Sequence, residues 1–262
     1  MERRKMNEES NRFEQIFLEV FESLPRQGPG SRECAIRALA LCHDLPTAPH
    51  VLDLGCGVGG QTLHLAELTS ASIVALDRHA PSIQQLETTI LKLGLTDRVQ
   101  PLVGDMAAPS LADASFDLVW SEGAFYNIGI VNALEVCRSL LKPGGYLAFT
   151  DAVWRVNEPP TDAKAMFETD YPEMGLIQDV IAKIAASQFS LVDHFSLPSE
   201  AWWQDFYTPM EARIDEMRSR YHGDPEALAV LDEVAQEPER HRRFSHFYDY
   251  EFFVVRLMDA AA

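Results

Sequence analysis

The sequence has few basic residues, no cysteine motif and no long apolar run. Its 22 lysines and arginines stand against 40 aspartates and glutamates, which gives a formal charge of −18. A molecule of this charge repels nucleic-acid phosphates and anionic lipid headgroups. We therefore expect neither a nucleic acid nor a membrane as a partner.

The four cysteines form no CxxC pair, and no histidine lies near them at the spacing of metal ligands. The common zinc-site patterns are thereby excluded, and we expect reduced, mostly buried thiols. None of the eight histidines shows a metal pattern either. The sequence predicts no metal site.

Apolar runs are short throughout the chain. None approaches the roughly 20 residues of a membrane span, and no apolar stretch follows the basic residues near the amino terminus. The pattern predicts a cytoplasmic protein without a secretion signal.

Apolar residues are nevertheless abundant, at 47% of 262 residues. This is enough for one large α/β domain that carries a cap. Short apolar strands are expected at residues 50–55, 72–77, 99–105, 116–122 and 145–151, with helices between them. This alternation predicts a doubly wound, mostly parallel sheet with helices on both faces. Pro101 interrupts the third strand and predicts that it lies at a sheet edge.

The segments on either side of this core are predicted to be mainly helical. An amphipathic helix is expected at residues 11–24 with Asn11 as its N-cap, and a second helix from the cap Ser31 to Pro46. Beyond residue 151 we expect a helix at 177–186, a strand at 189–197, a helical segment at 209–235 and a strand at 248–257. The two strands are expected to pair as a hairpin.

The long connection between these last two strands predicts a lid, because loops of this length are commonly functional covers. We expect the lid to comprise residues 151–186 and 202–235. It is rich in aromatic side chains, which either stack on a ligand or form the lid's own core. These are Tyr171, Trp202, Trp203, Phe206 and Tyr207.

The strongest motif is VLDLGCGVGG, in which a strand ending near Asp53 opens into a glycine-rich turn before a helix. Gly55, Gly57 and Gly60 allow close approach of a ligand to the backbone, and the helix N-terminus supplies free N–H groups. The spacing also satisfies the dinucleotide pattern GxGxxG. Asp77, at the end of the next strand, can accept hydrogen bonds from ribose hydroxyls in either kind of site.

An ordered set of motifs extends this pattern: VLDLGCGVGG, VALD, GDM, FDLVWSEGAFY and LKPGGYLAFTD. Together they resemble the class I, seven-stranded S-adenosylmethionine (SAM) dependent methyltransferases, and in particular a subgroup of small bacterial enzymes acting on small molecules. The resemblance covers residues 51–151. It implies an antiparallel last strand in the sheet. The LKPGG turn, in which we expect Leu140, Leu141 and Lys142 to finish a helix, is not part of the usual dehydrogenase pattern.

The resemblance also implies contacts with the cofactor. Asp53 and the backbone of Gly55, Cys56 and Gly57 are expected to face the methionine part of SAM, and Asp77 the ribose. The adenine is expected to lie among Arg78, Asp105 and Met106.

Residues after the fourth strand are expected near the transferable methyl group, because sites in such sheets lie beyond the carboxyl ends of the strands. These are Ser121, Glu122, Tyr126 and Asn127, of which we assign Ser121 to cofactor binding. Glu122 either anchors a ligand or acts as a general base. Tyr126 either bonds the acceptor, contacts the sulfonium or packs under the lid.

These observations predict transfer of a methyl group from SAM to a small molecule, with S-adenosylhomocysteine as the product. Two alternatives stay open: a SAM-binding or partner-binding protein without catalysis, and a dinucleotide-dependent oxidoreductase. We divide the chain into N-terminal helices over the cofactor site (1–46), a SAM-binding core (47–151), and the rest of the sheet with its lid (152–262). The amphipathic first helix fits packing on its own core as well as it fits a homodimer.

Overall fold

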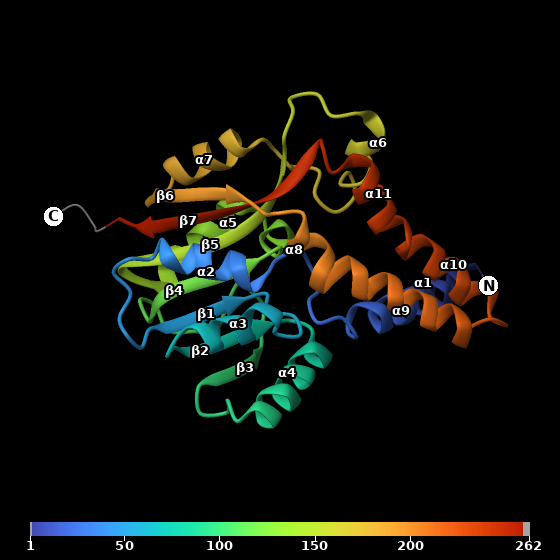
Figure 1. Cartoon of the computed structure of the whole chain (residues 1–262), viewed down its shortest axis with the longest axis horizontal. Coiled ribbons are helices and arrows are strands. Elements are labelled where there is room, and N and C mark those ends of the chain that lie inside the picture. The colour runs from blue at the N-terminus through green and yellow to red at the C-terminus, as the bar shows by residue number, and fades with distance from the viewer. Residues whose placement is uncertain (1, 259–262) are drawn as a thin grey trace.

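The computed structural model describes residues 2–258 and is built around one twisted sheet (Figure 1). The strands are β1 (His50–Leu54), β2 (Ser72–Asp77), β3 (Val99–Val103), β4 (Phe116–Glu122), β5 (Leu141–Trp154), β6 (Phe189–Ser196) and β7 (Tyr248–Leu257). Their order is β3-β2-β1-β4-β5-β7-β6. Strands β1 to β5 pair in parallel, and β7 pairs antiparallel with both of its neighbours. The predicted doubly wound sheet and antiparallel last strand are confirmed, and β3, which contains Pro101, lies at an edge.

Helices cover both faces of the sheet. One face carries α2 (Arg32–Ala40), α3 (Gly60–Leu68) and α4 (Ala80–Leu93), and the other carries α5 (Ile130–Leu140) and α7 (Ile177–Ala185). In α4 the buried residues Ile83, Leu86 and Ile90 recur at helical spacing and pack on the sheet. In α5 the same spacing brings Leu134 and Cys137 onto the opposite face. The two apolar layers hold the strand ends in fixed positions.

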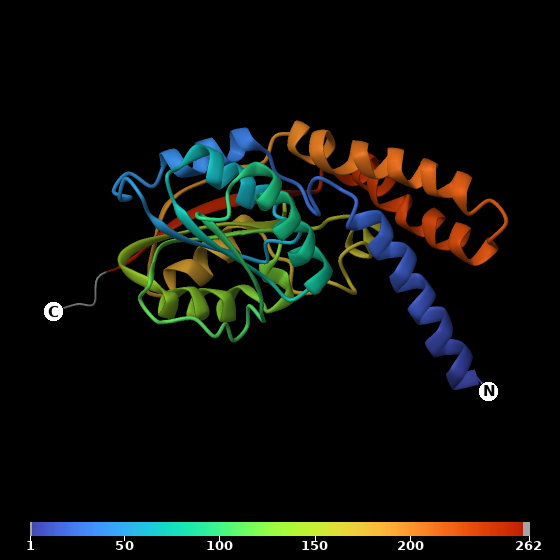
Figure 2. The same ribbon diagram turned by 90° about the horizontal axis from the view of Figure 1, so that it is seen from below.

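A third apolar cluster lies beyond the sheet in what we call the helical cap. The cap comprises α1 (Glu2–Phe21), α6 (Thr161–Lys164), α8 (Glu200–Trp202), the π-helical turn η2 (Trp203–Tyr207), α9 (Thr208–Arg220), α10 (Pro225–Val234) and α11 (Gln236–Phe244). Figure 2 shows α9 and α10 side by side beyond the sheet, with α1 leaving the sheet on the same side. Glu19 of α1 links it to α9, since it accepts hydrogen bonds from Arg213 (3.2 Å) and the neighbouring Tyr221 (2.8 Å).

The apolar stripe of α1 is used within the chain. Ile16 and Val20 of α1, together with Leu24 just after the helix, are buried in the cap cluster. The pattern that also fitted a homodimer is therefore explained by packing of α1 on its own molecule.

Several element boundaries differ from the sequence-based expectations. Helix α1 begins at Glu2, well before the expected cap Asn11, and α2 ends at Ala40 and not at Pro46. The expected helical segment 209–235 is two helices, since Asp224 caps a new helix by accepting a hydrogen bond from Ala227 N (3.0 Å). Leu141 and Lys142 belong to β5 and do not finish a helix.

Helix α7 was expected in the lid but packs on α5 and β6. Its buried residues Val180 and Ile184 join the cluster under the sheet, so it completes the helical layer on that face.

Among the described residues, no helix is long and apolar enough to cross a membrane.

Candidate functional site

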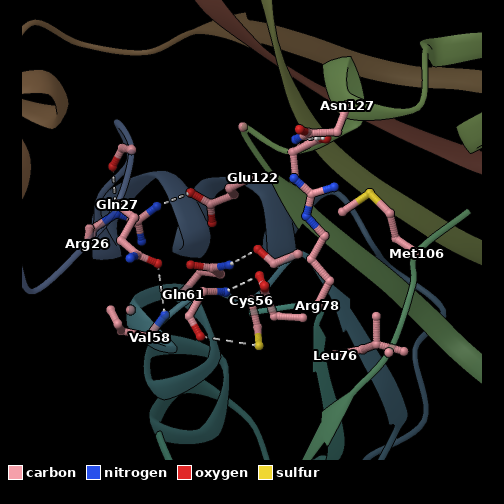
Figure 3. Close-up of a pocket in the computed structure, with 18 of the residues that line it drawn as sticks. Arg26, Gln27, Cys56, Val58, Gln61, Leu76, Arg78, Met106, Glu122 and Asn127 are labelled. Carbon is pink, nitrogen blue, oxygen red and sulfur yellow. Dashed lines mark hydrogen bonds and ion pairs between the residues drawn. The ribbon is translucent and has the colours of Figure 1, made fainter. Parts of the chain in front are cut away.

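A cavity of about 250 Å³ lies beyond the carboxyl ends of β1, β2 and β4. Its walls come from the loops that follow β1 to β4 and from the connection between α1 and α2, as Figure 3 shows. In an open α/β sheet this is where ligands bind. The connection, rather than helix α1 or α2 itself, is the part of the first 46 residues that lines the cavity.

The glycine-rich turn forms the floor of the cavity. Gly55 and Gly57 have φ angles of 76° and 52°, which favour glycine. A Cβ at Gly55 would lie 2.5 Å from the Cβ of Ala124 and 2.9 Å from the Cε of Met106. A side chain there would therefore overlap Ala124 and Met106, both of which line the cavity.

Asp53 lies beneath this turn and not on the cavity wall. It is fully buried and accepts hydrogen bonds from Thr62 Oγ1 (2.5 Å) and Gln61 Nε2 (3.2 Å). Burial raises its pKa to about 7. It is Gln61 that reaches the cavity, so Asp53 acts by fixing the start of α3.

Asp77 lines the cavity and also holds the turn in place. Its Oδ2 accepts a hydrogen bond from Gly57 N (2.9 Å) and its Oδ1 one from His79 N (2.8 Å). Arg78, Asp105 and Met106 line the same end of the cavity. The structure thus brings together the residues expected around ribose and adenine.

Cys56 also lines the cavity, next to Gly57. Burial raises its pKa well above the usual range, so the thiol is uncharged at neutral pH. Cys56 therefore contributes backbone and a small apolar side chain rather than a nucleophile.

Glu122 is one half of a buried ion pair. Its Oε2 lies 2.7 Å from Arg26 Nη2, and its Oε1 accepts a hydrogen bond from Trp120 Nε1 (2.7 Å). The side chains of Arg26 and Glu122 are only 4% and 2% exposed. With both carboxylate oxygens engaged, Glu122 is arranged to hold Arg26 and poorly placed to accept a proton.

Arg26 was not anticipated from the sequence. It comes from the connection RQGPG, whose composition indicates a turn, and it meets a partner 96 positions away. The available signal was a basic residue beside a glycine-proline turn, which is common on protein surfaces.

Two other expected residues lie outside the cavity wall. Ser121 is fully buried and donates a hydrogen bond to Leu54 O (2.8 Å), so it joins β4 to β1. Tyr126 is 37% exposed, next to the cavity-lining Asn127, with its ring 6.0 Å from that of Tyr171. Partial burial raises the pKa of Tyr126, so its hydroxyl stays protonated at neutral pH.

The aromatic side chains of the cap pack mainly on one another. Trp202 stacks on His241 with ring centroids 4.2 Å apart and lies edge-on to Tyr248 at 5.8 Å. The guanidinium of Arg242 lies 4.4 Å over the ring of Trp203.

In the described residues no three His, Cys, Asp or Glu side chains gather as metal ligands.

Several known proteins that this chain resembles are methyltransferases. Residues 51–145 match a family model described as a methyltransferase domain. Dimethylglycine N-methyltransferase of Parasynechococcus marenigrum is 31% identical over 147 residues, which are 56% of this chain and 48% of that protein. A sterol 24-C-methyltransferase of Gibberella zeae is 28% identical over 173 residues, 63% of this chain and 45% of that protein. The chain thus spans about half the length of these relatives, or less.

A solved structure resembles nearly the whole chain. The SAM-dependent methyltransferase from Geobacter sulfurreducens, crystallised with S-adenosylhomocysteine, has a TM-score of 0.79 at 20% identity and covers 94% of this chain and 98% of its own. That likeness shows a shared fold, and the matched domain lies on the sheet that forms the cavity. Residues 51–145 therefore match a methyltransferase domain, and the chain as a whole shares the fold of a solved SAM-dependent methyltransferase.

Proposed function

We propose that this protein transfers a methyl group from SAM to a small molecule and releases S-adenosylhomocysteine. The observation that carries the proposal is the cavity over the glycine-rich turn, whose lining includes Asp77, Asp105 and Arg26. SAM is a nucleoside with an amino-acid tail. Its ribose hydroxyls need hydrogen-bond acceptors from the protein, and its carboxylate needs a cationic partner.

The residues present fit this cofactor. Asp77 would hold the ribose, with Arg78, Asp105 and Met106 around the adenine. The backbone of Gly55, Cys56 and Gly57 would lie along the methionine part. Arg26 also lines the cavity, and its buried donor Nη1 has no partner among the described residues. When bound, SAM supplies a sulfonium methyl group for direct displacement.

The chain's own contribution is positioning and exclusion of water. Asn127 lines the cavity, and Tyr126 beside it would donate a hydrogen bond to the acceptor. We propose no proton transfer by Glu122, because Arg26 and Trp120 occupy both of its oxygens. Ser121 serves the cofactor only indirectly, through the β4–β1 contact.

Relatives support a small acceptor, since those named above are methyltransferases of dimethylglycine and a sterol. The charge of −18 also disfavours RNA or DNA as the acceptor. We propose that the protein works in the cytoplasm without a nucleic-acid or membrane partner, and that the cap covers the acceptor.

Calorimetric titration with S-adenosylhomocysteine and, separately, NADH tests the cofactor assignment. We expect S-adenosylhomocysteine to bind and NADH not to bind, because residues 51–145 match a methyltransferase domain. Binding of NADH alone would establish the oxidoreductase alternative.

Methyl transfer is tested next, with labelled SAM and a panel of amines, alcohols and activated carbons. Transfer to at least one acceptor is expected. Tight product binding without transfer to any acceptor would favour the catalytically silent alternative.

A further inference from the structure

The guanidinium of Arg26 is a buried charge that is only partly satisfied. We propose that Arg26 binds the carboxylate of the cofactor's amino-acid end, and that Glu122 is a positioning residue acting through Arg26. This inference rests on the proposed function and names a contact within its site.

The first observation is the unused donor. Arg26 Nη2 bonds Glu122 and approaches Pro29 O at 3.4 Å, and Nε approaches Gly28 O at 3.4 Å. Nη1 is buried and has no hydrogen-bond partner in the described part of the chain. A buried donor left unpaired is costly, and more so when it belongs to a charged group. A ligand that accepts a hydrogen bond at Nη1 removes that cost.

The second observation is the location of this donor. Arg26 lines the cavity beside the first turn of α3, because a Cβ at Gly60 would lie 2.7 Å from Arg26 Cγ. The N-terminus of a helix favours negative charge. Gln27 and Gln61 line the same end, so an anion there meets a cation, helix N–H groups and two amides.

The charged side chains of the lining favour one place for a ligand carboxylate. Glu122 balances the charge of Arg26, whereas Asp77 and Asp105 carry two negative charges beside the single positive charge of Arg78. The two aspartates accept hydrogen bonds from hydroxyl or amino groups and repel an anion. A ligand that has a carboxylate and a nucleoside is therefore bound more favourably with its carboxylate at Arg26.

Glu122 gains a defined role from this geometry. It occupies one nitrogen of the guanidinium and is itself fixed by Trp120, so the guanidinium of Arg26 is held in one orientation at the cavity wall. Figure 3 shows this pair above the turn. A lone arginine has many rotamers, and a preoriented one loses less entropy when it binds.

The test compares two ligands: S-adenosylhomocysteine and its decarboxylated analogue, which differs only by the missing carboxylate. Calorimetry on Arg26→Gln is expected to show S-adenosylhomocysteine binding weakened about 10- to 100-fold, the usual worth of a charged hydrogen bond. Affinity for the analogue is expected to stay unchanged. Arg26→Lys should recover part of the loss. An unchanged affinity for S-adenosylhomocysteine, or an equal loss for both ligands, would overturn the proposal.

Two controls separate recognition from folding. Arg32→Gln removes the same charge from a partly exposed ion pair with Glu67 outside the cavity, and the affinities for both ligands should stay as in the wild type.

Arg26→Gln leaves Glu122 buried without its partner. The double variant Arg26→Gln/Glu122→Gln removes both charges, and it is expected to fold and to show the same selective loss. Glu122→Gln alone keeps Arg26 and should still prefer S-adenosylhomocysteine to the analogue, though by a smaller factor. Loss of that preference with Arg26 intact would contradict the role of Arg26.

Failure of this inference and failure of the proposed function look different. If the wild-type protein binds neither ligand, the proposed function is wrong. If it binds S-adenosylhomocysteine and Arg26→Gln binds it equally well, only the assignment of Arg26 is wrong.

Discussion

At the scale of single residues, Gly55 meets two separate demands. Its φ of 76° disfavours any side chain, and the space where a Cβ would sit is taken by Ala124 and Met106. Strain in the backbone and overlap in the cavity therefore add at one position. The same residue decides both how the turn folds and how closely a ligand can approach.

Gly55→Ala is expected to lower the free energy of unfolding by about 2–4 kcal/mol through strain plus overpacking. It should also weaken S-adenosylhomocysteine binding at least tenfold. Urea unfolding and calorimetry measure the two effects. The matched control is Gly94→Ala, which has a φ of 67° but nothing within 4 Å of the added carbon. Equal effects of the two substitutions would show that overlap at Gly55 contributes nothing.

The residues of the site were predictable where the signal was local. Asp77, Arg78, Asp105 and Met106 end strands or follow them directly, and all four line the cavity. Ser121, which we predict to bind the cofactor, does not line the cavity, and alternation along β4 puts it on the opposite face from Glu122. Arg26 could not be predicted, because its role depends on a partner that only the tertiary fold brings near.

At the scale of elements, the cap is held together by aromatic rings around the π-helical turn η2. Trp202 is 5% exposed and contacts His241, Tyr207, Tyr248 and Tyr250, whereas the next residue, Trp203, is less buried and carries Arg242 over its ring. Trp202 is therefore part of the cap core, whereas Trp203 lies at its margin. They form a natural pair for comparison.

Trp202→Ala is expected to cost about 3–5 kcal/mol of stability, as large-to-small changes in a core do. Trp203→Ala should cost less, about 1–2 kcal/mol. Urea unfolding of both variants, with S-adenosylhomocysteine titration as a second readout, checks this. A larger loss for Trp203 would show that the described packing does not govern cap stability.

The elements themselves were largely predictable, and their roles less so. Short apolar runs located every strand of the sheet, and their alternation with helical segments located the helices between them. Helix α7 was assigned to the lid because the regular alternation had already ended, yet its apolar stripe fits the sheet layer. Periodicity shows that a helix has an apolar face but not which surface that face meets.

At the scale of the whole molecule, the buried carboxyls give stability a characteristic dependence on pH. Burial raises the pKa values of Asp53 and Asp151 to about 7 from 3.8. Between pH 4 and 7 the folded chain therefore binds more protons than the unfolded chain. Their contribution to stability is present at the lower end of this window and is lost as pH rises through 7.

Asp151→Asn tests this sign. Asp151 is 2% exposed, accepts a hydrogen bond from Tyr171 Oη (2.7 Å) and has Lys183 as its nearby cation. Removing the charge should raise stability at pH 8, by at least about 2 kcal/mol, and raise it by less than half as much at pH 5, where the folded carboxyl is still protonated. Urea unfolding at both pH values gives the comparison, with exposed Asp97→Asn as the control. A gain at pH 5 that equals the gain at pH 8 would be inconsistent with the raised pKa.

The position of β7 has a consequence for synthesis on the ribosome. β7 lies between β5 and β6 and is the neighbour through which both complete their pairing, yet it is translated only after α8 to α11. During that interval the growing polypeptide holds two strand edges with unpaired N–H and C=O groups, which are sites for aggregation. Translation of the cap helices therefore sets how long these two edges stay unpaired on the ribosome.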